Sequence, residues 1–224
     1  STVEEVKKYW PIRVHPDGRP RGSRAWVDDH MLKGVTENIN FNIQINPDGT
    51  TPYYNNSVFE LTFDVRELDT FYVKTMAPLE GVQGRAVLTR TAFDVFVNDG
   101  TVMGMPVGGS VAHMTDIHIR GGAQGEFDVE VEGDVGQILT LVDTKPVFIS
   151  DKIGIDLERL SGSARVEANL KLPLIKKPAK EAVLYDITAY IKSGGVAQLL
   201  GGEGLRDADL KLNVNGDELT TSGF

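Results

Sequence analysis

The fold is decided by Ile39-Asn40-Phe41-Asn42-Ile43-Gln44-Ile45, a stretch in which apolar and polar residues alternate strictly. Successive side chains of a β-strand point to opposite faces of a sheet, so this spacing gives one apolar face and one polar face. The same alternation returns at 59–66 and at 164–172. The sequence therefore predicts a mainly β chain whose sheet has one apolar face.

Turn signals separate the expected strands. Asn46-Pro47-Asp48-Gly49, Asn98-Asp99-Gly100 and Gly121-Gly122 supply residues that adopt the positive φ angles of tight hairpins. Strands that follow one another through such turns pair antiparallel. We expect strands at 36–46, 57–66, 84–90, 92–98, 101–107, 110–120, 125–132, 162–172, 183–192, 207–215 and 218–222.

Helical spacing of apolar residues is confined to short segments. It predicts helices at 3–10, 23–34, 135–142 and 196–200, each ended by proline or glycine. The predicted fold class is a large curved antiparallel sheet, as a trough, half-barrel or sandwich, with a few short helices. We expect a helical lead-in at 1–34, a larger β unit at 35–175 and a C-terminal β unit at 176–224 that continues the same sheet.

Composition excludes several classes of protein. The 224 residues carry a formal net charge of −9, which opposes binding to nucleic acid because that binding relies on lysine and arginine. The absence of cysteine excludes disulfides and thiolate metal sites. No apolar stretch approaches the roughly 20 residues that span a bilayer. We expect a soluble fragment of a longer protein whose membrane anchor lies outside it.

No compact catalytic motif is present, and we expect no enzyme, no cofactor and no metal. His113 and His118 are five positions apart on the expected strand 110–120, so they face opposite sides and cannot share a metal. The acidic residues at 126, 128, 130 and 132 form the polar face of one strand. The enzyme alternative needs carboxylates that converge from different strands, such as those of Asp94, Asp116 and Asp128.

Several segments together resemble the AsmA-like family, in the branch that carries the YhdP-type central region. Residues 75–86 resemble its recurring passage from a proline-containing loop through glycine into a strand. Residues 134–142, followed by Pro146-Val147, resemble its short helix between strands, and residues 162–174 resemble its alternating strand that ends in Pro-Leu. Residues 183–189 and 204–223 are similar to the next β element.

The resemblance implies a large Gram-negative envelope protein, anchored in the inner membrane, whose periplasmic part is a β-sheet trough. It implies phospholipid transport between the inner and outer membranes, and no catalytic residues. We therefore expect a periplasmic location, with partners that are a phospholipid or another acyl-chain ligand and the neighbouring segments of the same chain. The alternative is a structural or interaction β-module that has no ligand of its own.

The candidate lipid contacts are apolar residues on the predicted inner face of the sheet. They are Ile39, Phe41, Ile43, Phe59, Leu61, Phe63, Phe93, Val95, Ile117, Ile119, Phe127 and Val129.

Overall fold

The computed structural model describes residues 1–9, 23–44, 58–72, 76–142, 160–175, 178–196, 205–215 and 218–223. The helices are α1 (Val3–Tyr9), α2 (Ser23–His30), α3 (Val135–Val142) and the short 3-10 helix η2 (Lys180–Ala182). The strands are β1 (Met31–Gln44), β2 (Val58–Thr70), β3 (Leu79–Thr89), β4 (Ala92–Val102), β5 (Met105–Pro106), β6 (Val111–Thr115), β7 (Gln124–Asp134), β8 (Leu160–Pro173), β9 (Leu184–Val196), β10 (Leu205–Asn215) and β11 (Glu218–Gly223).

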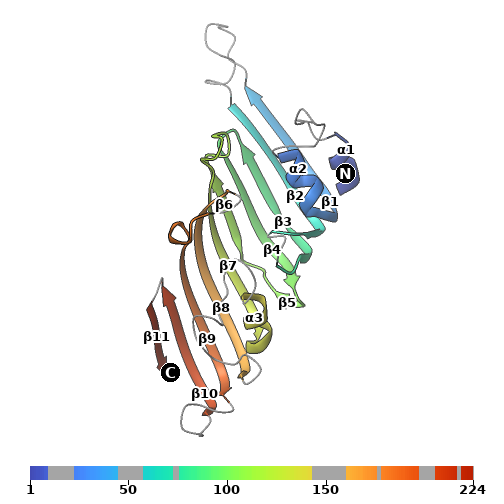
Figure 1. Ribbon diagram of the computed structural model, residues 1–224. Helices are drawn as coiled ribbons and strands as arrows, with labels where there is room; N and C mark the ends of the chain where they lie inside the picture. Colours follow the sequence, from blue (N-terminus) through green and yellow to red (C-terminus); the bar gives the residue numbers. More distant parts are fainter. Residues whose placement is uncertain are drawn as a thin grey trace.

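All the strands belong to one antiparallel sheet (Figure 1). Its order is β1-β2-β3-β4-β6-β7-β8-β9-β10-β11, and the two-residue β5 pairs with β4. β1 and β11 are the two edges, so the sheet is not closed. The prediction of a mainly β fold, with a large antiparallel sheet and a few short helices, is confirmed.

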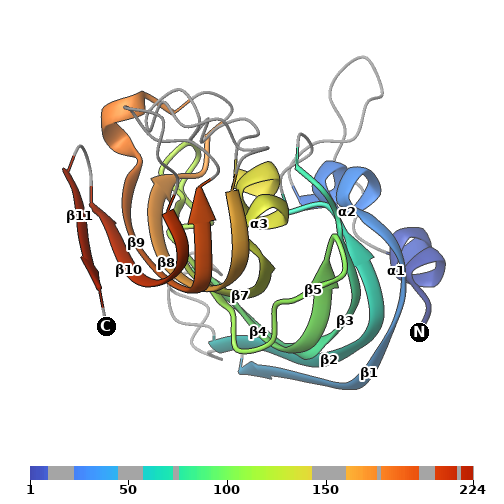
Figure 2. The same ribbon diagram turned by 90° about the horizontal axis from the view of Figure 1, so that it is seen from below.

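The sheet is strongly curved because several strands contain bulges. Asn38, Glu67, Ser193 and Asp207 lie within strands yet have φ angles of 50°, 52°, 49° and 53°. A bulge adds one residue to one strand of a pair and bends that strand. Figure 2 shows the result, in which the strands curve around α2 and α3, whereas α1 lies beside the edge strand β1. Helices α2 and α3 therefore lie on the concave side of the sheet.

Two apolar clusters fill the lower end of the concave side, where β2, β4, β7 and β9 end in Figure 1. The larger one packs Val135, Ile138 and Leu141 of α3 against the sheet and the β5 hairpin. Its other buried members are Val102, Met105, Val107, Val131, Ala164 and Val166. The smaller one joins Val3 of α1 and Val27 of α2 to Met31.

The predicted second helix is too long at its C-terminal end. It ends at His30, and β1 begins at Met31, which pairs with Thr70 of β2. Gly34 is therefore not a helix cap but a residue of β1 with a φ of 137°. A Cβ atom at Gly34 would lie 2.8 Å from the Leu68 Cα atom, so glycine is needed here because β2 passes close by.

Two further strand predictions are wrong. Asn98-Asp99-Gly100 forms no hairpin but continues β4, and the chain turns instead at Met103 and Gly104. The strand predicted at 110–120 ends at Thr115, since Asp116 adopts a φ of 53° and a turn follows. His118 lies in that turn, so it does not share a strand with His113.

Some predictions fall outside the described residues, namely the turn at 46–49 and the helix at 196–200 beyond Val196, which ends β9. The division into units at 34/35 and 175/176 stays a prediction. β1 continues through the first of these boundaries. β8 lies before the second boundary and β9 after it, and the two strands pair with each other from Leu160↔Val196 to Lys171↔Leu184.

Candidate functional site

The concave face of the sheet carries two long rows of apolar residues. Residues that are directly opposite in neighbouring strands share a face, so the strand register defines each row. The first row is Phe41, Leu61, Leu88, Phe93 and Met114. The second row is Phe63, Ala86, Val95, Ala112, Phe127 and Leu170. We call these two rows, together with Ile39, Ile43, Phe59 and Val129 beside them, the apolar sector.

The structure brings most of the predicted lipid contacts together in this sector. Ile39, Phe41 and Ile43 follow one another on the concave side of β1, and Ile43 lies opposite Phe59. Ile117 and Ile119 are the exceptions, because they lie in the turn at 116–122 and belong to no strand. Sequence reasoning missed Leu88, Met114, Ala86, Ala112 and Leu170, although the alternation within 84–90, 110–115 and 164–172 contains them.

The apolar sector is the part of the concave face that α3 does not cover. Along β7, Val131 beneath α3 is only 4% exposed, whereas Val129 is half-buried. Along β8, the same change occurs between the buried Val166 and the half-buried Ala168. Apart from Ala86, every residue of the sector is half-buried or exposed.

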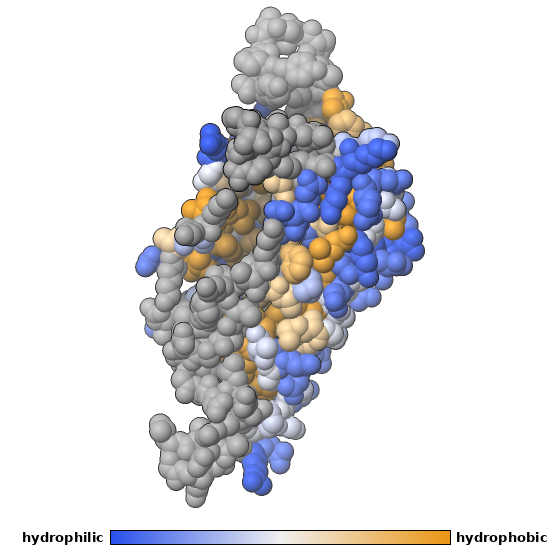
Figure 3. Space-filling view, turned by 45° about the vertical axis from the view of Figure 1, so that its right-hand side comes forward, coloured by the Kyte–Doolittle hydropathy of each residue, from blue (hydrophilic) through white to orange (hydrophobic). Residues whose placement is uncertain are grey.

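Exposure within the sector is greatest along β1. Ile39 and Phe41 are each 54% exposed, and Ile43 is 46% exposed. The Phe41 and Phe59 rings pack edge to face with 5.4 Å between their centroids. Figure 3 shows hydrophobic residues gathered in a hollow beside a largely hydrophilic surface. Contiguous exposed apolar surface of this kind is typical of a ligand or partner site.

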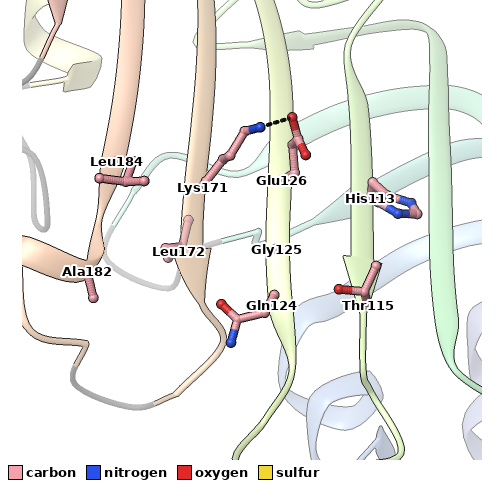
Figure 4. Close-up of a pocket in the computed structure, with 9 residues that line it drawn as sticks. All are labelled: His113, Thr115, Gln124, Gly125, Glu126, Lys171, Leu172, Ala182 and Leu184. Carbon is pink, nitrogen blue, oxygen red and sulfur yellow. Dashed lines mark ion pairs between the residues drawn. The ribbon is translucent and has the colours of Figure 1, made fainter.

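The convex face of the sheet is polar and carries a row of charged residues. The register places Asp94, His113, Glu126 and Lys171 opposite one another on β4, β6, β7 and β8, and Leu184 of β9 lies opposite Lys171. His113, Glu126, Lys171 and Leu184 border a shallow hollow of about 370 Å³, in which an ion pair joins Lys171 Nζ to Glu126 Oε1 at 2.8 Å (Figure 4).

The charges of the convex row are paired with one another. The hydrogen bonds from Lys171 and Asn169 hold the pKa of the Glu126 carboxyl below its usual range. His113 Nδ1 contacts Asp94 Oδ1, and Asn169 Nδ2 also donates to Asp128 Oδ1 at 2.7 Å. These pairs hold the strands in register on the solvent side, so they have an evident structural role.

The carboxylates of the enzyme alternative are not gathered into one site. Asp94 lies on β4 and Asp128 lies on β7, and β6 lies between these strands. Two strand spacings amount to a separation of about 10 Å. Asp116 lies in the turn after β6. Among the described residues, no group of three or more histidine, aspartate or glutamate side chains could hold a metal ion.

By its fold, the chain is an open, curved antiparallel sheet with an apolar concave face and a polar convex face. Comparisons with protein-family models, curated proteins and solved structures find no match for it. The resemblance to AsmA-like proteins therefore stays a prediction. Within the described part of the chain, no helix has the length and apolar character needed to cross a membrane.

Proposed function

We propose that the chain is a non-enzymatic periplasmic segment of an AsmA-like envelope protein, and that its apolar sector holds acyl chains of phospholipids in transit between the two membranes. The observation that carries the proposal is the exposure of Ile39, Phe41 and Ile43 beside the two apolar rows of the concave face. The membrane anchor of such a protein belongs to a part outside these residues.

The physical basis of the proposal is burial of methylene groups. Each CH₂ group that leaves water contributes about 0.8 kcal/mol, so an apolar floor can retain an acyl chain without any specific bond. The two rows cross β2, β3, β4 and β6 side by side, which gives a continuous floor transverse to the strands. The polar convex face offers no such surface, so acyl chains are expected on the concave side only.

The test is photo-crosslinking to lipid from chosen positions. A benzophenone amino acid replaces Phe41 or Phe63 in the apolar sector, and Phe96 in the matched control. Phe96 suits this purpose because it is 42% exposed and lies on the convex face opposite Arg85. Native mass spectrometry and lipid extraction of the unmodified protein then identify any phospholipid that co-purifies.

We expect phospholipid crosslinks from positions 41 and 63 and none from position 96. Equal crosslinking from all three positions would mean non-specific contact with lipid. A protein that carries no lipid and crosslinks from none of them would contradict the proposal.

A second candidate function is that of a structural module whose edges pair with other strands. Its support is the edge of β1, where Ser1 N donates to Thr36 O at 2.8 Å and Thr36 N donates to Ser1 O at 2.7 Å. Thr2 and Val35 form an antiparallel bridge at the same place. This edge therefore accepts an antiparallel strand, and exposed strand edges readily template further pairing.

Hydrogen exchange at β1 separates the two candidates. If the edge from Glu37 to Gln44 pairs with another chain, its amide protons gain protection as protein concentration rises. If the chain acts through its apolar sector, this protection does not depend on concentration.

A further inference from the structure

Two exposed arginines lie at the upper end of the sheet, next to the apolar sector. Arg90 lies in the turn that joins β3 to β4, and Arg120 lies in the turn at 116–122 that joins β6 to β7. Neither residue belonged to the predicted lipid contacts, because only apolar residues were chosen as candidates.

The two turns are held side by side by backbone contacts. Ile117 N donates to Thr91 O at 3.2 Å, and the first residue of β4, Ala92, lies opposite the last residue of β6, Thr115. Within the second turn, Ile119 N donates to Asp116 O at 2.9 Å, which fixes the start of the loop that carries Arg120. The two arginines are thus carried by one connected rim.

This rim borders the first apolar row. Leu88 of that row lies in the last residues of β3, two positions before Arg90, so the turn that carries Arg90 begins at the upper end of this row. Phe93 follows the first turn, and Met114 precedes the second. Ile119, next to Arg120, is 48% exposed. The two turns that carry the arginines therefore border the upper end of the first apolar row.

Neither arginine has an ion-pair partner among the described residues, although the chain has a net charge of −9. By contrast, Arg66 is paired with Glu37, and Arg165 is paired with Glu130. Asp116 is the only acidic residue in the two turns. An unpaired guanidinium group presents a fork of N–H donors that matches a phosphate group.

We propose that Arg90 and Arg120 bind the phosphate of a phospholipid headgroup whose acyl chains lie in the apolar sector. This inference rests on the proposed function, because it assumes that acyl chains occupy the sector. It adds a requirement on the ligand: lipids that carry a phosphate are retained better than lipids with the same acyl chains and no phosphate.

The test compares two lipids in detergent micelles, dioleoyl phosphatidylglycerol and dioleoylglycerol, by photo-crosslinking from position 63. The variant combines Arg90→Gln with Arg120→Gln. The matched control combines Arg85→Gln with Arg206→Gln, which changes the charge equally on the convex face and at the lower end of β10. Thermal unfolding by circular dichroism confirms that all three proteins fold.

We expect crosslinking to phosphatidylglycerol to fall about fivefold in the rim variant, Arg90→Gln with Arg120→Gln, because two solvent-exposed charge contacts are lost. Crosslinking to dioleoylglycerol should not change. The control variant behaves as the parent protein does. Unchanged phosphatidylglycerol crosslinking in the rim variant would overturn the inference and leave the proposed function intact. An equal loss of crosslinking to both lipids would have the same meaning. A parent protein that crosslinks to neither lipid would overturn both.

A separate titration with inorganic phosphate distinguishes a headgroup from the free ion. Phosphate that competes with phosphatidylglycerol in the parent protein, and not in the rim variant, supports the inference. Binding of inorganic phosphate by the parent protein, with lipid crosslinking intact in the rim variant, would assign the rim to the free ion and overturn the inference.

Discussion

Gly34 shows how a single residue shapes the start of the sheet. Its φ of 137° lies in a region that side chains other than hydrogen rarely allow, and it faces the Leu68 backbone of β2. From sequence, a glycine after a helical segment is typical of a helix cap, which is why the helix at 23–34 was predicted too long. The choice between cap and strand depends on β2, which lies more than 20 residues away.

We expect Gly34→Ala to lower the free energy of unfolding by about 2–4 kcal/mol, since backbone strain and a steric clash combine. The measurement is urea unfolding followed by circular dichroism. Gly104→Ala is the matched control, because Gly104 has a φ of 77° but no atom within 4 Å of the added Cβ. A loss at Gly34 no larger than the loss at Gly104 would contradict the clash.

At the scale of elements, α3 determines which part of the concave face is filled. Its spacing predicted a helix at 135–142, and the structure has that helix with Val135 and Ile138 buried. Its third buried residue is Leu141, whereas Leu139 only packs against the margin of the cluster. The spacing of Val135, Ile138, Leu139 and Val142 predicted a buried face that includes Leu139. The structure buries Leu141 instead, because the two leucines lie on different sides of the helix and α3 packs on the sheet through the side of Leu141.

We expect Ile138→Ala to lower the free energy of unfolding by about 2–4 kcal/mol, because it leaves a cavity between α3 and the sheet. Leu139→Ala serves as the matched control and should cost about 1 kcal/mol, since that side chain is only partly buried. Chemical unfolding measures both variants. Equal losses would mean that α3 packs on a different face from the one described.

At the scale of the whole molecule, one sheet extends over both predicted unit boundaries, 34/35 and 175/176. β8 and β9 pair along most of their lengths, and Val166 of β8, which packs beneath α3, lies opposite Ala189 of β9. Removal of β9–β11 would therefore expose the edge of β8 and one side of the larger apolar cluster.

We expect the truncated chain 1–175 to unfold several degrees below the chain 1–224, because it loses that pairing and the contacts of Ala189 and Ile191 with the cluster. Differential scanning calorimetry measures both, and the longer chain should show a single transition. Equal midpoints, or two transitions in the longer chain, would instead support independent units on either side of 175/176.

The sequence by itself determined most of the strands, the apolar identity of one face and the approximate positions of α1, α2 and α3. It did so because strand alternation and helical spacing are local and are written in neighbouring residues. Phe41, Phe63 and Phe127 could be assigned to one face for that reason.

The tertiary structure decided which part of that face stays uncovered, where the sheet bends and which turns lie together. The exposure of Val129 but not Val131 depends on α3, and the adjacency of the two turns that carry Arg90 and Arg120 depends on the pairing of β4 with β6. These features join residues that are distant in the chain, so no local pattern records them.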